Sequence, residues 1–261
     1  IYILTGDGDA SPSVNYFTKR GAGVYKTTDA GNTWNITGLN WQMSEGKVGY
    51  ELQMSPVNPN ILFAATSNGV YRTLDGGNNW VVNWPGTPIS CIRFKPDDPN
   101  RLVASAIGAN RLLISTTGGD IWFFSPFLSL PSSSAYTRGE LAVTPANPDI
   151  VYLICSSGVS PTIYQGLHAY KWSTNSLSTL HTTPDILGGQ VWYNIGLWVS
   201  PTDPNQISAA GTPVFRSTNG GTAFTADQDI LHADIHGYYY NSLDGRLYIT
   251  TDGGIAYSTN N

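Results

Sequence analysis

The sequence predicts an all-β protein, a β-propeller of four-stranded antiparallel blades, from three observations. Charged residues make up 12% of the 261 residues, while Gly, Pro, Tyr and Trp are plentiful. Such a composition suits half-buried strands joined by tight turns. A polar turn pattern and a proline-rich turn pattern each recur, apart from one insertion, at intervals of roughly 42–46 residues, which is the length of a propeller blade. Blades of this kind bury their faces against neighbouring blades.

The polar turn pattern is Ser or Thr, any residue, Asp or Asn, any residue, Gly, two further residues and an aromatic ring. Copies of it, the last two incomplete, occupy residues 27–34, 73–80, 115–122, 217–224, 173–175 and 258–261. The Asp or Asn side chain accepts backbone N–H groups of its own turn, and the Gly supplies a positive φ. We therefore assign structural roles to Asp29, Gly31, Trp34, Asp75, Gly77, Trp80, Gly119, Trp122, Asn219, Gly221 and Phe224.

The proline-rich pattern separates two apolar alternating runs, at residues 55–60, 95–100, 144–149 and 200–205, with a proline-free version at 241–246. With these turns the chain forms one propeller domain, whose expected blades span about residues 1–40, 48–84, 88–127, 138–182, 191–228 and 232–261. The first blade lacks its innermost strand and the last blade lacks its outermost strand. Either the two ends complete one another or the chain continues past Asn261. We favour continuation, and expect six or seven blades.

Charge and hydropathy exclude some classes of partner. The formal net charge is −5, which argues against nucleic acid as a partner. The chain has no apolar run of about 18 residues, so we expect no membrane span. Cys91 and Cys155 each lie in an apolar run, and we expect buried free thiols there.

The polar turns resemble those of Asp-box (BNR-like) propellers, which include sialidases, sortilin-type receptors and xyloglucan-hydrolysing glycosidases. Residues 4–9, 64–71, 232–236 and 248–255 are most similar to propellers of large secreted Bacteroidota proteins, often exported by type IX secretion. The resemblance covers nearly the whole chain. It implies an extracellular or cell-surface location and further domains in the same polypeptide. It is specific for the fold and says little about the function, because one fold hosts many activities.

The loops opposite the polar turns are the expected binding face, because long loops on a rigid scaffold usually bind ligands. Asp7, Asp9 and Asp252 lie in such loops. If the ring closes, these carboxylates are candidate ligands for Ca²⁺, and the alternative is that they only form turns. We expect no other cofactor.

His232, Asp234 and His236 alternate at the entry to an innermost strand, and a period of two places three side chains on one side. Imidazole and carboxylate groups in this arrangement suit a transition metal. A hydrogen-bonded network is the alternative that we favour.

The catalytic candidates are the acids Asp7, Asp234, Glu51 and Glu140. Glu51 and Glu140 occupy the same repeat position on innermost strands. Paired carboxylates suit glycoside hydrolysis, which needs an acid and a base or nucleophile at a defined separation. The sequence does not determine that separation, so no catalytic residue is assigned.

Trp41, Trp192 and Tyr193 lie in or beside loops and away from the turn pattern. Flat rings pack well against sugars, and the alternative is packing between blades. The candidate ligand-binding residues are therefore Asp7, Asp9, Trp41, Trp192, Tyr193, His232, Asp234, His236 and Asp252.

Three functions fit these observations. The one we favour is a non-catalytic binding or scaffold module of a secreted or surface protein, which recognises glycan or protein on its loop face. The alternative is a xyloglucanase-like glycoside hydrolase acting with a missing second domain, because those enzymes place the active cleft between two propellers. The third is adhesion or assembly through blade edges.

Overall fold

The computed structural model describes residues 1–8, 20–109, 111–125, 136–157, 163–227 and 232–259. Within these residues, 22 strands form six antiparallel sheets, and the helical content is one short 3-10 turn, η1 (Met43–Glu45). The prediction of an all-β protein is therefore confirmed. No helix in these described segments is long and apolar enough to cross a membrane. The chain divides into two compact units, residues 1–126 and 127–261.

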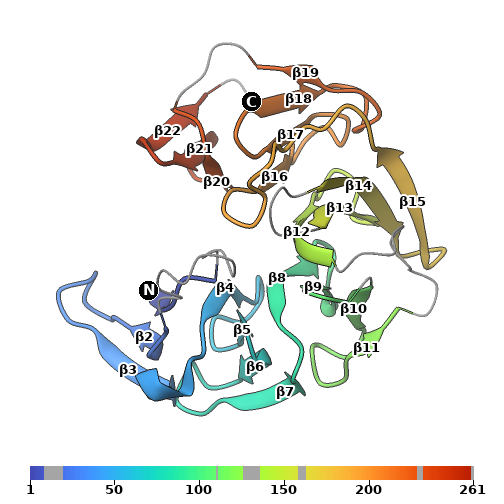
Figure 1. Ribbon diagram of the computed structural model, residues 1–261. Helices are drawn as coiled ribbons and strands as arrows, with labels where there is room; N and C mark the ends of the chain where they lie inside the picture. Colours follow the sequence, from blue (N-terminus) through green and yellow to red (C-terminus); the bar gives the residue numbers. More distant parts are fainter. Residues whose placement is uncertain (9–19, 110, 126–135, 158–162, 228–231, 260–261) are drawn as a thin grey trace. The chain divides into compact units, whose positions relative to one another are not determined.

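The first unit holds three sheets in which each strand pairs with the next strand in sequence (Figure 1). The strands are β1 (Tyr2–Leu4), β2 (Gly23–Lys26) and β3 (Asn35–Asn40), then β4 (Gly49–Met54), β5 (Leu62–Thr66), β6 (Gly69–Thr73) and β7 (Val81–Pro85), then β8 (Ile89–Lys95), β9 (Asp98–Ala106), β10 (Leu112–Ser115) and β11 (Phe123–Phe124). Strand β4 contacts both β1 and β8, so the first strands of successive sheets meet.

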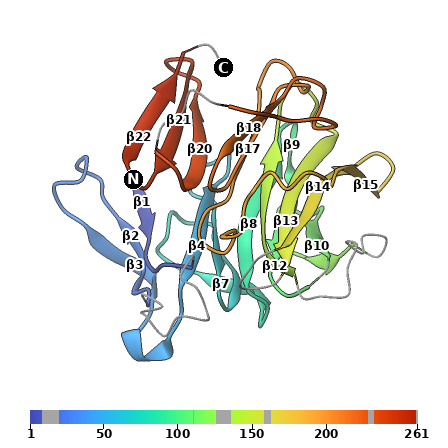
Figure 2. The same cartoon turned by 45° about the horizontal axis from the view of Figure 1, so that its top comes forward.

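The second unit repeats this meander three times (Figure 2). Its strands are β12 (Tyr136–Val143), β13 (Ile150–Ser157), β14 (Ile163–Lys171) and β15 (Ser176–His181), then β16 (Gly196–Val199), β17 (Ile207–Ala210), β18 (Val214–Ser217) and β19 (Thr225–Ala226), then β20 (Ile235–Asn241), β21 (Arg246–Thr251) and β22 (Gly254–Ser258). Strand β16 contacts both β12 and β20. Four-stranded sheets that meander and meet through their first strands are the blades of a β-propeller.

The four complete polar turns share one hydrogen-bond pattern. In the first, Thr27 Oγ1 accepts the Gly31 N–H at 3.0 Å and Asp29 Oδ1 accepts the Thr33 N–H at 2.9 Å. The other three turns repeat both bonds at N···O distances of 2.9–3.0 Å. In the third turn, the hydroxyl of Thr117 accepts in place of the missing carboxylate. The turn therefore forms without an acid.

Each proline-rich turn lies beside the polar turn of its own sheet. The carbonyl groups of Asn60, Asn100 and Asn205 accept N–H groups from the first glycine of the neighbouring polar turn, at 2.8–3.0 Å. The two turn types therefore lie at the same end of the sheet, as the repeat pattern predicts.

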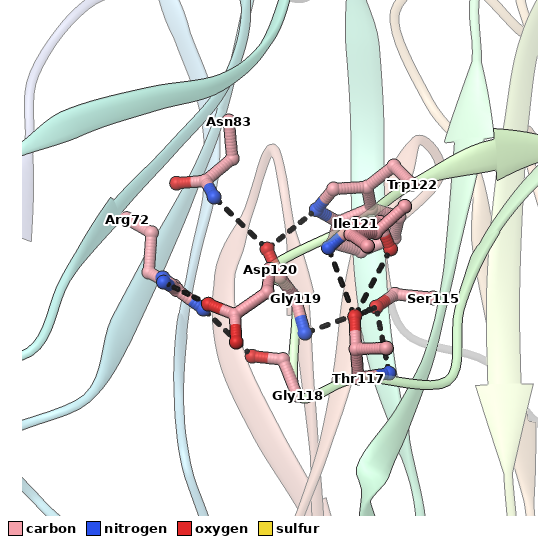
Figure 3. A network of polar contacts seen from close by, with 9 residues as sticks. All are labelled: Arg72, Asn83, Ser115, Thr117, Gly118, Gly119, Asp120, Ile121 and Trp122. Carbon is pink, nitrogen blue, oxygen red and sulfur yellow. Dashed lines mark hydrogen bonds and ion pairs between the residues drawn. The ribbon is translucent and has the colours of Figure 1, made fainter.

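A polar contact joins the second and third sheets of the first unit (Figure 3). Arg72 Nη1 donates to the Gly118 carbonyl oxygen at 3.1 Å, and its other terminal nitrogen pairs with the Asp120 carboxylate. Asn83 Nδ2 donates to the Gly119 carbonyl oxygen at 3.0 Å. In the first sheet, Lys26 makes the equivalent bond to the second sheet. In the first and second sheets, the basic residue that precedes the polar turn thus connects its sheet with the next one.

Apolar side chains pack between the same two sheets. Phe63 is 0% exposed and makes edge-to-face contacts with Phe94 and Trp122 at ring distances of 5.7 and 6.3 Å. A Cβ atom at Gly119 would lie 2.3 Å from the Phe63 ring. The glycine of this turn is therefore required both for its φ of 84° and for the close approach of the ring.

The two cysteines are free and buried, in β8 and in β13. This confirms the expectation drawn from their apolar surroundings. Burial raises the pKa of the Cys155 thiol to about 12, so this group stays protonated and acts as a small apolar side chain.

Candidate functional site

The link between β15 and β16 presents two aromatic side chains on an anchored backbone. Trp192 and Tyr193 are half-buried, and their ring centroids are 5.6 Å apart. The flanking residues of the link that are buried in the hydrophobic core are Ile186, Leu187, Val191 and Ile195. Because these anchors lie on both sides, the two rings are held in place before any ligand arrives.

Tyr193, His236 and Asp252 form a compact polar contact. The Tyr193 hydroxyl donates to Asp252 Oδ1 at 2.8 Å, and His236 Nε2 lies 2.7 Å from the same oxygen. The rings of Tyr193 and His236 meet edge to face at 4.7 Å. His236 lies in β20, and Asp252 lies in the two-residue turn between β21 and β22. Three separate segments therefore converge on one carboxylate.

The Asp252 carboxyl is held in its charged form. The hydrogen bond from His236 and then that from Tyr193 lower its pKa below the ordinary value for an aspartate. Both donors stabilise the carboxylate because hydrogen bonds to the charged form favour it.

Asp234 lies next to this contact and has a left-handed backbone, with φ of 63°. Its carbonyl oxygen accepts the Asp252 N–H at 3.3 Å, and its carboxylate accepts a hydrogen bond from Asn194 Nδ2. Asn194 is 0% exposed, and its Oδ1 has no hydrogen-bond partner within the part of the chain that the structure describes. A buried acceptor without a partner is costly, which marks this position as one that a donor would fill.

The regular alternation predicted for His232, Asp234 and His236 is interrupted in the structure. The left-handed residue at 234, together with a register shift between Ile235 and Gly237 in β20, breaks the period of two. Asp is among the few residues that adopt this conformation readily. Over the described segments, no three His, Cys, Asp or Glu side chains gather as metal ligands.

His232 completes the group. It is exposed, its Nδ1 lies 3.1 Å from the Ala233 carbonyl oxygen, and its side chain covers Gly253, where an added Cβ would lie 2.6 Å from it. We call the whole set the Tyr193 cluster; its members are Trp192, Tyr193, His232, Asp234, His236 and Asp252. The structure thus brings together six candidate residues from the sequence.

Two residues of this surface were missed by the sequence analysis. Arg138 Nη1 donates to the carbonyl oxygens of Trp192 and Tyr193 at 3.2 and 3.3 Å and so holds the aromatic link. Asn194 donates a hydrogen bond to the Asp234 carboxylate. Asn194 directly follows the aromatic pair, which was a usable signal, whereas no repeat position connects Arg138 with a link more than fifty residues away.

Trp41 is a candidate ligand-binding ring that is not exposed to a ligand. It is 4% exposed and packs edge to face against Tyr71 at 5.9 Å. Protein atoms therefore cover its ring, and no sugar can stack there. Packing between blades, the alternative for this residue, describes its surroundings.

The remaining candidates belong to other segments of the chain. Glu51 accepts the Ile92 N–H at 2.7 Å and pairs with Arg93, so it connects β4 with β8. Glu140 lies in β12 opposite Ile154. Asp7 follows β1, and Asp9 lies outside the described residues. The calcium site at Asp7, Asp9 and Asp252 therefore stays a prediction.

The Tyr193 cluster offers aromatic ring surface beside charged and polar acceptors on an exposed part of the molecule. Such a surface suits recognition of a sugar or of a peptide side chain. Hydrolysis of a glycoside would require a second carboxyl group at a defined distance from Asp252, and Asp234 is the acid closest to it in the hydrogen-bond network.

No protein-family model and no curated protein matches the chain. Several solved structures are similar to the chain. A GH74 enzyme from Niastella koreensis is 19% identical, with a TM-score of 0.69 over 99% of this chain and 43% of its own. The GH74 xyloglucanase from Xanthomonas campestris is 15% identical, with a TM-score of 0.69 over the same shares of the two chains.

A third similar structure is the extracellular domain of a hybrid two-component system from B. thetaiotaomicron. It is 14% identical, with a TM-score of 0.64 over 98% of this chain and 31% of its own. This chain therefore spans less than half the length of each of these proteins. At such low identity the likeness concerns the fold alone, and the chain is a β-propeller with about six blades.

Proposed function

We propose that this chain is a non-catalytic propeller of a secreted or cell-surface protein and that it binds glycan through the Tyr193 cluster. The observation that carries the proposal is the pair Trp192 and Tyr193, held on a buried anchor beside the charged Asp252. Aromatic rings contribute apolar area to a sugar ring, and the neighbouring carboxylate accepts from sugar hydroxyls.

Two likenesses support this proposal. The polar turns resemble those of Asp-box propellers of secreted Bacteroidota proteins, and one similar structure is an extracellular domain. Two similar structures belong to GH74 enzymes, one of them a xyloglucanase. We infer an extracellular location, with type IX export as its route, and further domains of the same polypeptide as partners. Adhesion through a glycan is consistent with this placement.

A glycoside hydrolase is the second candidate. It is favoured by the likeness to the GH74 enzymes and by the presence of two carboxylates, Asp234 and Asp252, in one cluster. In this case the chain would act with a second domain. Release of reducing ends distinguishes the two functions.

The proposal is tested by affinity gel electrophoresis against plant, algal and bacterial polysaccharides. We expect retardation by at least one of them, and a Tyr193→Ala variant should bind at least about tenfold more weakly, because a buried ring contact is worth more than about 1.4 kcal/mol.

Tyr248→Ala is the matched control, since Tyr248 also donates its hydroxyl to an aspartate at 2.8 Å but lies outside the cluster. Equal losses in both variants, or no loss in Tyr193→Ala, would place the binding surface elsewhere.

A further inference from the structure

Three donors at the Tyr193 cluster are already occupied within the protein. The Tyr193 hydroxyl donates to Asp252 Oδ1, and the amide nitrogen of Asn194 donates to the Asp234 carboxylate. His236 Nε2 faces Asp252 Oδ1, a carboxylate oxygen that can only accept, so this nitrogen carries the proton in the neutral ring.

Apart from the indole N–H of Trp192, the groups that the described cluster leaves for a ligand are acceptors. With Nε2 protonated, the Nδ1 of neutral His236 accepts. His232 Nδ1 faces the Ala233 carbonyl oxygen, so its Nε2 likewise accepts. The two carboxylates each have a second oxygen. The buried Oδ1 of Asn194, which no described residue reaches, adds a neutral acceptor.

Arg138, a cation beside this surface, does not reverse that balance. Arg138 directs Nη1 at the carbonyl oxygens of Trp192 and Tyr193, behind the rings that it holds. The outward-facing formal charges are the two carboxylates of Asp234 and Asp252. An anion would meet acceptors and negative charge, and the donor that the described cluster would offer it is the indole N–H of Trp192.

We propose that the Tyr193 cluster selects glycans with free amino groups and rejects glycans with carboxylate or sulfate groups; this rests on the proposed glycan-binding function. An ammonium group has three donors and no acceptor, which matches the acceptors of the cluster. It is also attracted to the faces of Trp192 and Tyr193. A donor that reaches the buried Asn194 Oδ1 supplies the hydrogen-bond partner that this oxygen lacks.

The test is calorimetric titration of the whole chain at neutral pH with three hexasaccharides. They are chitosan hexamer, with free amines, its N-acetylated counterpart, chitin hexamer, and galacturonic acid hexamer. We expect chitosan hexamer to bind about tenfold or more tightly than chitin hexamer, as one desolvated ammonium contact allows, and galacturonic acid hexamer not to bind.

Asp252→Asn and Asp234→Asn each replace an acceptor by a group that can donate, with almost no change in shape. Both variants should lose the preference for chitosan. Asp244→Asn is the matched control, because Asp244 is an exposed aspartate of the same unit that accepts a tyrosine hydroxyl outside the cluster. It should keep the preference, which separates the site from general attraction between a polycation and an acidic protein.

Equal affinity for the chitosan and chitin hexamers overturns the inference while leaving the proposed function intact. A chitosan preference that survives in the Asp234→Asn, Asp252→Asn double variant also overturns it. Absence of binding to all three sugars, with Tyr193→Ala unchanged towards polysaccharides, contradicts the proposed function itself. Equally tight binding of a lysine hexapeptide, lost in the same variants, would identify a polypeptide ligand and contradict both.

Discussion

In the second polar turn, the hydroxyl of Thr73 accepts the Gly77 N–H at 3.0 Å and donates to Asp75 Oδ1 at 2.8 Å. Thr73 is 1% exposed, whereas Asp75 lies at the surface. The buried hydroxyl and the exposed carboxylate therefore share the turn, and they should respond differently to substitution and to pH.

At position 73, removal of the hydroxyl leaves the buried Gly77 N–H without its acceptor. Thr73→Ala should therefore lower the free energy of unfolding by about 1–3 kcal/mol, measured by urea denaturation. Thr73→Ser keeps the hydroxyl and serves as the control. If both variants lost the same stability, the loss would come from the methyl group rather than from the hydrogen bond.

The carboxyl groups of Asp29 and Asp75 should make the fold sensitive to acid. Hydrogen bonds from Thr33 lower the pKa of Asp29 to about 2, and bonds from Asn79 lower that of Asp75 to about 2. A carboxyl group whose pKa is lower in the folded state stabilises that state above its unfolded pKa of about 3.9. This stabilisation is lost as the pH falls towards 2.

The check is the unfolding temperature of the protein and of an Asp29→Asn, Asp75→Asn double variant from pH 6 to pH 2. Asn is tolerated in this turn, as Asn219 shows in the fourth copy. The difference between the two proteins should be constant above about pH 4 and shrink below it. A difference that stays constant down to pH 2 would contradict the assignment.

At the scale of the element, strands and turns were predictable because two periodicities determine them. The proline-rich turn at 55–60 was expected between two strands and lies between β4 and β5. Alternation does not encode a left-handed residue, so the interruption at Asp234 was not predicted. Burial of a loop residue depends on the next sheet, so Trp41 was misassigned for a different reason. The contact of Arg72 with Asp120 joins β6 of one sheet to the polar turn of the next and has no local signal.

Packing between sheets should be most sensitive at Phe63. Phe63→Ala opens a cavity against Phe94 and Trp122 and should cost about 3–5 kcal/mol in the free energy of unfolding. Phe123, on β11 and 41% exposed, is the control, and Phe123→Ala should change stability by less than about 1 kcal/mol. Similar losses for both variants in urea denaturation would show that Phe63 does not hold the two sheets together.

At the scale of the whole molecule, the repeat residues determine the fold, and surface residues outside the repeats determine the activity. The turns, the polar contacts between sheets and the hydrophobic core are formed by residues that recur. The Tyr193 cluster is formed by residues outside the repeat. Similar propellers include GH74 enzymes and an extracellular domain of a two-component system, so the fold alone does not select an activity. The sequence indicated six members of the cluster, but the sharing of Asp252 Oδ1 by Tyr193 and His236 required the structure.

The most direct test of the central claim is the release of reducing ends from a polysaccharide that the chain demonstrably binds. We predict binding that Tyr193→Ala weakens and no new reducing ends above a buffer blank. New reducing ends that disappear in Asp252→Asn or Asp234→Asn, while binding persists, would show that the cluster is an active site and would contradict the account.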